Sequence, residues 1–132
     1  MNPVDQPADI LLVDDNPANL RLLAQILGER GHRVRAVTSG QRALASAFMH
    51  APDLVLLDIR MPRLTGYDVC RRLRAEPSTR DIPIAFLSAK RQEAEIQAGM
   101  DAGATDYILK PFAPDQLINR VALLLGEPGT QL

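Results

Sequence analysis

The chain has 132 residues, of which 46% are hydrophobic, a formal net charge of -1 and one cysteine, Cys70. This length fits a single domain, one cysteine excludes an intrachain disulfide, and the nearly balanced charge gives no general attraction to nucleic acid. The hydrophobic runs are too short to cross a membrane and residues 1–8 lack a secretory signal, so we expect a cytoplasmic protein without direct nucleic-acid or membrane contacts.

The first apolar run, residues 10–13, is typical of a buried strand. Asn16 followed by Pro17 then predicts the start of a helix, because asparagine caps helices and proline suits the first helical position. This helix should end at Gly31. Its predicted apolar stripe consists of Leu20, Leu23 and Leu27.

Residues 32–37 alternate polar and apolar side chains, as expected of an edge strand with Val34 and Ala36 on its covered face. Ser39 can cap a second helix. Residues 54–58 are apolar until the final aspartate, which predicts a central strand buried on both faces.

A loop then leads to Gly66, which opens a third helix. Its predicted inner face consists of Val69, Cys70 and Leu73, so we interpret the cysteine as a packing residue. Residues 84–87 form the fourth apolar strand. The helical segment at residues 92–102 has only Ile96 and Met100 as large apolar residues, so it should be the least firmly held element.

The last strand, residues 106–109, precedes a helix that begins at Pro114 and should bury Leu117, Val121 and Leu124. Five alternations of strand and helix predict an α/β fold, in which helices cover both faces of a five-stranded parallel sheet. We expect the domain to span residues 9–125, between a flexible arm at residues 1–8 and a loose tail at residues 126–132.

Four of the predicted strands run directly into polar residues, which are Asp14 with Asp15, then Asp58, Ser88 and Lys110. Because the carboxyl ends of parallel strands meet at one edge, these side chains should share one pocket. Carboxylates about 4 Å apart repel by roughly 4 kcal/mol per pair at an effective dielectric near 20. A hard cation relieves this repulsion, and Mg²⁺ is suited because it takes oxygen ligands.

Such a cation would let a phosphoryl group approach an acidic pocket. Asp58 is then the candidate nucleophile, while Ser88 and Lys110 are candidates to bind the transferred oxygens. Taken singly, each residue has a plainer interpretation as a helix cap, a turn former or a solvated strand end. Their joint placement after successive strands favours phosphoryl transfer.

Five short motifs make the chain closely resemble the receiver domain of two-component response regulators, over residues 9–125. They are Val13-Asp14-Asp15-Asn16, Leu57-Asp58-Ile59-Arg60-Met61-Pro62, Thr65-Gly66, Leu87-Ser88-Ala89 and Lys110-Pro111-Phe112. The resemblance implies a doubly wound, flavodoxin-like (βα)5 fold with strand order 2-1-3-4-5. It implies that Asp58 accepts phosphate from a histidine kinase or a phosphotransfer domain, as a signalling phosphoacceptor that catalyses only its own phosphoryl transfer and dephosphorylation.

The resemblance also implies a set of magnesium ligands. These are Asp15, Asp58 and the backbone carbonyl of Arg60, with Asp14 acting mainly through water. Arg60 and Lys90 occupy positions where the family tunes the lifetime of the phosphoryl group. Both are long cations here, so we expect them to shield the acyl phosphate from water.

Ser88 and Tyr107 match the switch pair of the family, in which the hydroxyl moves toward the phosphate and the ring turns inward. The bond Lys110-Pro111 matches one that is usually cis. The switch should act on the segment at 92–102, the last strand and the last helix, and change a surface around Ile96, Met100 and Tyr107. This surface would bind a downstream target or output domain, or a second copy in a phosphorylation-dependent homodimer.

Three rival interpretations start from the same residues. A phosphatase related to haloacid dehalogenases needs a second aspartate two positions after its nucleophile, and after Asp14 this position is Asn16. A degenerate receiver would signal without phosphate, against which the intact acidic, hydroxyl and lysine set argues. A flavin-binding relative would need a phosphate-cradling first turn, which is acidic here.

Overall fold

The computed structural model describes residues 7–88, 93–110 and 113–126. Within these residues, five parallel strands form one sheet in the order β2-β1-β3-β4-β5. The strands are β1 (Asp9–Val13), β2 (Arg33–Val37), β3 (Leu54–Asp58), β4 (Ile84–Ser88) and β5 (Asp106–Leu109). The helices are α1 (Pro17–Glu29), α2 (Gly40–Met49), α3 (Gly66–Ala75), α4 (Glu93–Asp101) and α5 (Pro114–Leu124).

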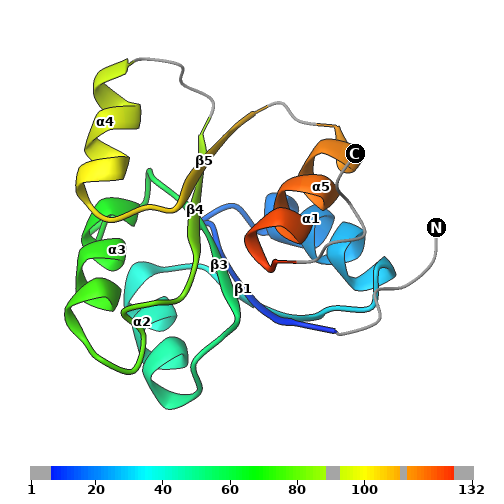
Figure 1. Ribbon diagram of the computed structural model, residues 1–132, viewed down its shortest axis with the longest axis horizontal. Helices are drawn as coiled ribbons and strands as arrows, with labels where there is room; N and C mark the ends of the chain where they lie inside the picture. The colour runs from blue at the N-terminus through cyan, green and yellow to red at the C-terminus, as the bar shows by residue number, and fades with distance from the viewer. Residues whose placement is uncertain (1–6, 89–92, 111–112, 127–132) are drawn as a thin grey trace.

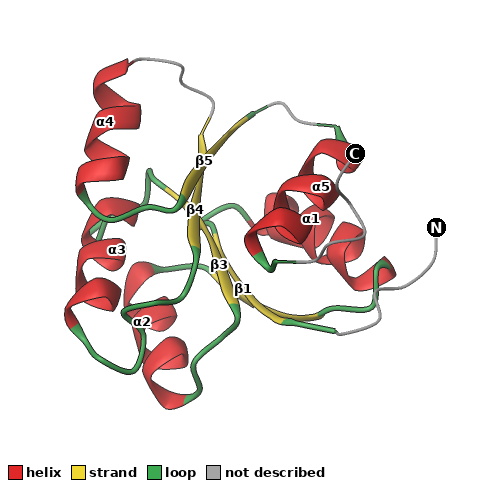
Figure 2. Cartoon of the chain, in the orientation of Figure 1, coloured by secondary structure: helices red, strands yellow, loops and turns green. Residues whose placement is uncertain are grey.

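Helices cover both faces of the sheet (Figure 1). Figure 2 shows α1 and α5 on one side of the strands and α2, α3 and α4 on the other. The predicted α/β class and the strand order 2-1-3-4-5 are therefore confirmed. No helix in the described part of the chain is both long and apolar enough to cross a membrane.

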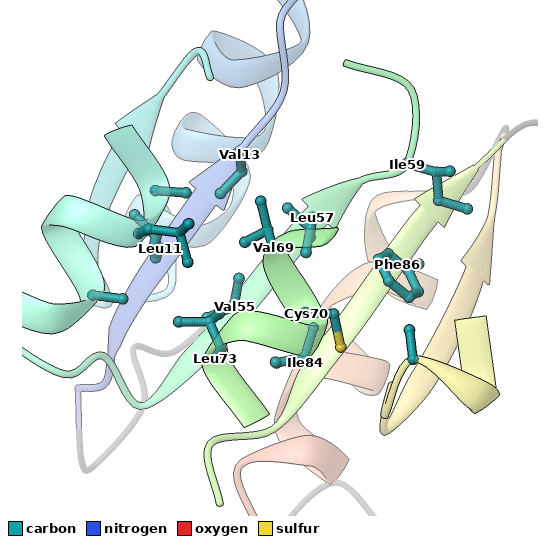
Figure 3. Close-up of a cluster of buried hydrophobic side chains, with 14 of the residues drawn as sticks. Leu11, Val13, Val55, Leu57, Ile59, Val69, Cys70, Leu73, Ile84 and Phe86 are labelled. Carbon is teal, nitrogen blue, oxygen red and sulfur yellow. The ribbon is translucent and has the colours of Figure 1, made fainter. Parts of the chain in front are cut away.

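The core consists of two apolar layers, one on each face of the sheet. Alternate residues of the central strands point to opposite faces, so both layers draw on β1, β3 and β4. The layer beneath α2 and α3 contains Leu11, Val13, Val55, Leu57, Ile84 and Phe86 (Figure 3). Cys70 lies in this layer, where burial raises the pKa of its thiol, which confirms it as a packing residue.

The edge strand β2 departs from the predicted burial pattern. Val34 is half-buried as expected, but Ala36 is exposed and Arg35 is half-buried. The reason is that the Arg35 guanidinium donates to Asp9 at 2.9 Å and to the Ser46 hydroxyl at 2.8 Å. The polar face of β2 is therefore partly covered at Arg35, although the sequence predicted that this face is open to solvent.

The predicted helix boundaries are close to the observed ones. The Asn16 side chain accepts from the backbone N–H of Ala18 at 2.9 Å, and Ser39 caps α2 in the same way through Arg42. In α5 the predicted apolar stripe is shifted by part of a turn, because Leu124 is only half-buried. The residues that α5 does bury are Leu117, Ile118, Val121 and Ala122.

Gly66 fixes the distance between α3 and the end of β3. A Cβ atom at this position would lie 2.4 Å from the carbonyl oxygen of Asp58 and 2.9 Å from the Cα of Ile59. Backbone atoms cannot yield as flexible side chains do, so only glycine allows this approach. The start of α3 therefore packs directly against the backbone of Asp58 and Ile59.

We predict that Gly66→Ala lowers the free energy of unfolding by about 1–3 kcal/mol through overpacking against this backbone. Gly28→Ala is the matched control, because a Cβ there meets nothing within 4 Å. It lies in α1 and should raise the free energy of unfolding by about 0.5–1 kcal/mol. Denaturant unfolding measures both, and equal stabilities for the two variants would contradict this account of Gly66.

Candidate functional site

The register of the sheet brings the polar strand ends to one edge. Val13 pairs with Leu57, so Asp14 and Asp58 leave neighbouring strands at the same level. On the other side of β3, the backbone N–H of Lys110 donates to the carbonyl of Ser88 at 2.7 Å. The structure therefore gathers the strand-end residues along one rim.

Three carboxylates cluster on this rim. Asp14, Asp15 and Asp58 each offer an oxygen, and these three atoms lie within 4.8 Å of one another. Asp14 is buried, Asp58 is half-buried and Asp15 is exposed. The cluster is thus closed toward the core and open toward solvent.

Asp14 is held by several partners. Its Oδ1 accepts from the backbone N–H of Asn16 at 2.9 Å, and its Oδ2 accepts from the Asn19 amide at 3.2 Å. The ammonium of Lys110 lies 3.6 Å from the same Oδ2. Asp14 therefore fixes the position of the lysine, and the helix cap that a plainer interpretation assigned to it is supplied by Asn16.

The environment of Asp58 disfavours its charged form. Burial is the main cause and the Asp14 charge the next, and together they raise the pKa of Asp58 from 3.8 to about 6. Lys110 and the backbone N–H of Arg60 act in the opposite direction without cancelling this effect. A hard cation among the three carboxylates would offset the repulsion, and an all-oxygen donor set with open access to water suits Mg²⁺.

Ser88 and Tyr107 lie on neighbouring strands beside the cluster. Both are buried, and the Tyr107 ring stands edge-on to Phe86 with centroids 6.4 Å apart. Within the residues that the structure describes, the Tyr107 hydroxyl has no hydrogen-bond partner. The ring therefore occupies an inward position under α4.

Two expectations fall outside the described residues. They concern Lys90 and the bond Lys110-Pro111, since residues 89–92 and 111–112 are not described.

Sequence reasoning missed the connection between this site and α4. The Arg60 guanidinium lies 3.6 Å from the Glu95 carboxylate, and the Tyr67 hydroxyl donates to the backbone carbonyl of Glu95 at 3.1 Å. These residues are distant in sequence and no local pattern pairs them. In the sequence, only the opposite charges of Arg60 and Glu95 point to this contact.

Comparisons with known proteins decide the family. The profile of the response regulator receiver domain matches residues 10–122. The chain belongs to this family. It is 40% identical over 127 residues to the DNA-binding response regulator MtrA of Mycolicibacterium smegmatis, covering 93% of this chain and 54% of MtrA. It is 43% identical over 119 residues to the response regulator MprA of Mycolicibacterium vanbaalenii, covering 90% of this chain and 51% of MprA.

Solved structures agree with this assignment. The receiver domain of a sensor histidine kinase from Pseudomonas aeruginosa, solved with magnesium in its active-site cleft, is 35% identical with a TM-score of 0.85, covering 92% of this chain and 99% of that one. The BeF3-activated receiver domain of DrrB is 30% identical with a TM-score of 0.81, at the same coverages. The chain is therefore a receiver domain, and it spans about half the length of the curated relatives it matches.

The raised pKa of Asp58 predicts a pH-dependent cost to stability. Between pH 3.8 and about pH 6, Asp58 keeps a proton in the folded state that it has lost in the unfolded state. The contribution of Asp58 to the free energy of unfolding is therefore fully present below pH 3.8. It is lost as the pH rises through about 6.

We predict that Asp58→Asn, which has no charge to bury, gains stability relative to the wild type across this window, on the order of 2 kcal/mol after allowance for solvent screening. Denaturant unfolding at several pH values measures the difference. A difference that stays constant across the window would contradict the raised pKa.

Proposed function

We propose that this receiver domain is a Mg²⁺-dependent phosphoacceptor, in which Asp58 takes phosphate from a histidine kinase or a phosphotransfer domain. The observation that supports this most directly is the cluster of Asp14, Asp15 and Asp58 within 4.8 Å, next to the ammonium of Lys110. Carboxylates alone would repel a phosphoryl group. A divalent cation and the Lys110 ammonium would add positive charge, so that the same rim attracts a phosphoryl group.

In the proposed transfer, a carboxylate oxygen of Asp58 forms a bond to phosphorus while the bond from phosphorus to the donor breaks. The leaving group keeps the bonding electrons, and with a phosphohistidine donor this group is the imidazole. In this proposal Lys110 binds a phosphoryl oxygen as a point charge, and Ser88 donates a hydroxyl hydrogen bond. Asp14 acts as a positioning residue, because it holds Lys110.

The magnesium ligands that we propose are Asp15, Asp58 and the backbone carbonyl of Arg60. Asp14 acts mainly through water, since its oxygens already accept from Asn16 and Asn19. When bound, Mg²⁺ neutralises charge on the transferred group. Turnover is confined to the domain's own phosphoryl group, so we do not propose an enzyme that acts on other substrates.

The proposed output is a changed surface on α4, β5 and α5. Ser88 and Tyr107 form the switch pair, and phosphate adds roughly -1.5 to -2 of charge that favours closure of Ser88 and Lys110 over it. In this structure Met100 is 47% exposed on α4, where it is available to a partner. The partner is a downstream target, an output domain or a second copy of the chain.

We propose that the receiver spans residues 9–125 and acts in the cytoplasm, where phosphorylated kinase domains can reach it. MtrA is named as DNA-binding, but this chain aligns with only 54% of it. With a net charge of -1 and no general attraction to polyanions, the receiver itself is not proposed to bind nucleic acid.

We also propose that Arg60 and Lys90 set the lifetime of the phosphoryl group by shielding it from water. Arg60 pairs with Glu95 in this structure, so shielding requires its guanidinium to leave that partner.

The acceptor assignment is tested by intact-mass spectrometry after incubation with acetyl phosphate and Mg²⁺. We predict one added phosphoryl group in the wild type and none in Asp58→Asn, because an amide cannot form the acyl phosphate. Asp101→Asn is the matched control on exposed α4 and should label like the wild type. Labelling of Asp58→Asn would place the acceptor elsewhere, and removal of Mg²⁺ should suppress labelling of the wild type.

A further inference from the structure

Helix α4 is held very differently at its two ends. At the C-terminal end, Arg74 of α3 donates to the carbonyl of Gly103 at 2.8 Å and to the Thr105 hydroxyl at 3.2 Å. The same guanidinium donates to the carbonyl of Ile82 at 2.5 Å. One arginine thus ties the end of α4 to α3 and to the start of β4.

The fit at this end depends on Gly103. Its φ is +105°, and a Cβ there would lie 2.8 Å from Cγ of Arg74. The turn after α4 also closes with backbone bonds from Gly103 to Met100 and from Ala104 to Gly99, both 3.0 Å long. The C-terminal end of α4 is therefore a fixed point.

Toward the other end, the described contacts of α4 include two at Glu95, whose backbone carbonyl accepts from the Tyr67 hydroxyl at 3.1 Å. Its carboxylate lies 3.6 Å from the Arg60 guanidinium, with the arginine side chain 65% exposed and the glutamate side chain 24% exposed. An ion pair this exposed contributes little to stability. Separating the Arg60 side chain from Glu95 therefore costs little free energy.

Arg60 connects this weak contact to the phosphorylation site. It lies two residues after Asp58, and its backbone N–H is close enough to lower the pKa of the Asp58 carboxyl. A phosphoryl group on Asp58 would present a denser negative charge than Glu95, in a geometry that a guanidinium can bind with two hydrogen bonds. The two anions therefore compete for one cation.

We propose that Arg60 is an exchangeable latch: it pairs with Glu95 while Asp58 is unmodified, and turns to the phosphoryl oxygens once Asp58 carries phosphate. This inference rests on the proposed function of Asp58. Loss of the pair loosens the N-terminal part of α4, where the Tyr67 hydroxyl remains bonded to the Glu95 carbonyl, while Arg74 keeps the C-terminal end in place. The helix then swings about Gly103, and its motion is largest near Glu95.

The latch can be tested by NMR amide exchange, with beryllium fluoride and Mg²⁺ as a stable substitute for the phosphoryl group. In the unliganded protein, Arg60→Gln and Glu95→Gln should each speed exchange of the Gln97 and Ala98 amides by roughly 1.5- to 5-fold. The double variant should add nothing further, because both changes remove the same pair. Exchange at Ala102 and Ala104, next to the fixed end, should stay unchanged.

Arg63→Gln is the matched control for Arg60→Gln, because it removes an exposed arginine from the same loop. It should leave exchange in α4 as in the wild type. Beryllium fluoride should speed exchange at Gln97 in the wild type, and much less in Arg60→Gln. By reciprocity, Glu95→Gln should bind beryllium fluoride roughly 1.5- to 5-fold more tightly than the wild type.

Three results would overturn the latch. The first is unchanged exchange in Glu95→Gln, and the second is an equal response to beryllium fluoride in the wild type and Arg60→Gln. Either would refute the latch while leaving Asp58 as acceptor. The third, no binding of beryllium fluoride to the wild type, would overturn the proposed function together with the latch.

Discussion

The ion pair between Asp14 and Lys110 organises the acidic rim of this protein. Asp14 is buried, and a buried carboxylate is costly unless hydrogen bonds or opposite charge compensate it. Here two amide donors and an ammonium do so. Because Lys110 pairs with Asp14, it offsets only part of the repulsion at Asp58. Negative charge therefore remains at the rim that a bound cation would neutralise.

The same arrangement links the fold to its chemistry. Parallel pairing of β1, β3, β4 and β5 is what places residues from four distant parts of the chain on one rim. Gly66 then seats α3 on the backbone of Asp58. The position of Asp58 is therefore set by the sheet on one side and by α3 on the other, so this carboxylate is preorganised.

Much of this could be predicted from sequence, and the reason is visible in particular residues. The apolar runs of β1, β3 and β4 are buried on both faces, so their pattern was unambiguous, and Asn16 and Ser39 cap helices through strictly local bonds. The burial of β2 was predicted wrongly, because Arg35 depends on Asp9 and Ser46 in other elements. The pairing of Arg60 with Glu95 was missed for the same reason: such contacts exist only once the chain has folded.

The proposed chemistry requires Asp15 and Asp58 to hold a divalent cation at this rim, and a thermal unfolding titration with Mg²⁺ tests this requirement most directly. A ligand that binds only the folded state at ten times its dissociation constant adds about 1.4 kcal/mol of stability. We predict that the Tm of the wild type rises with Mg²⁺, and that the rise is lost in Asp15→Asn and Asp58→Asn. An unchanged wild-type Tm, or an equal rise in all three proteins, would contradict the account.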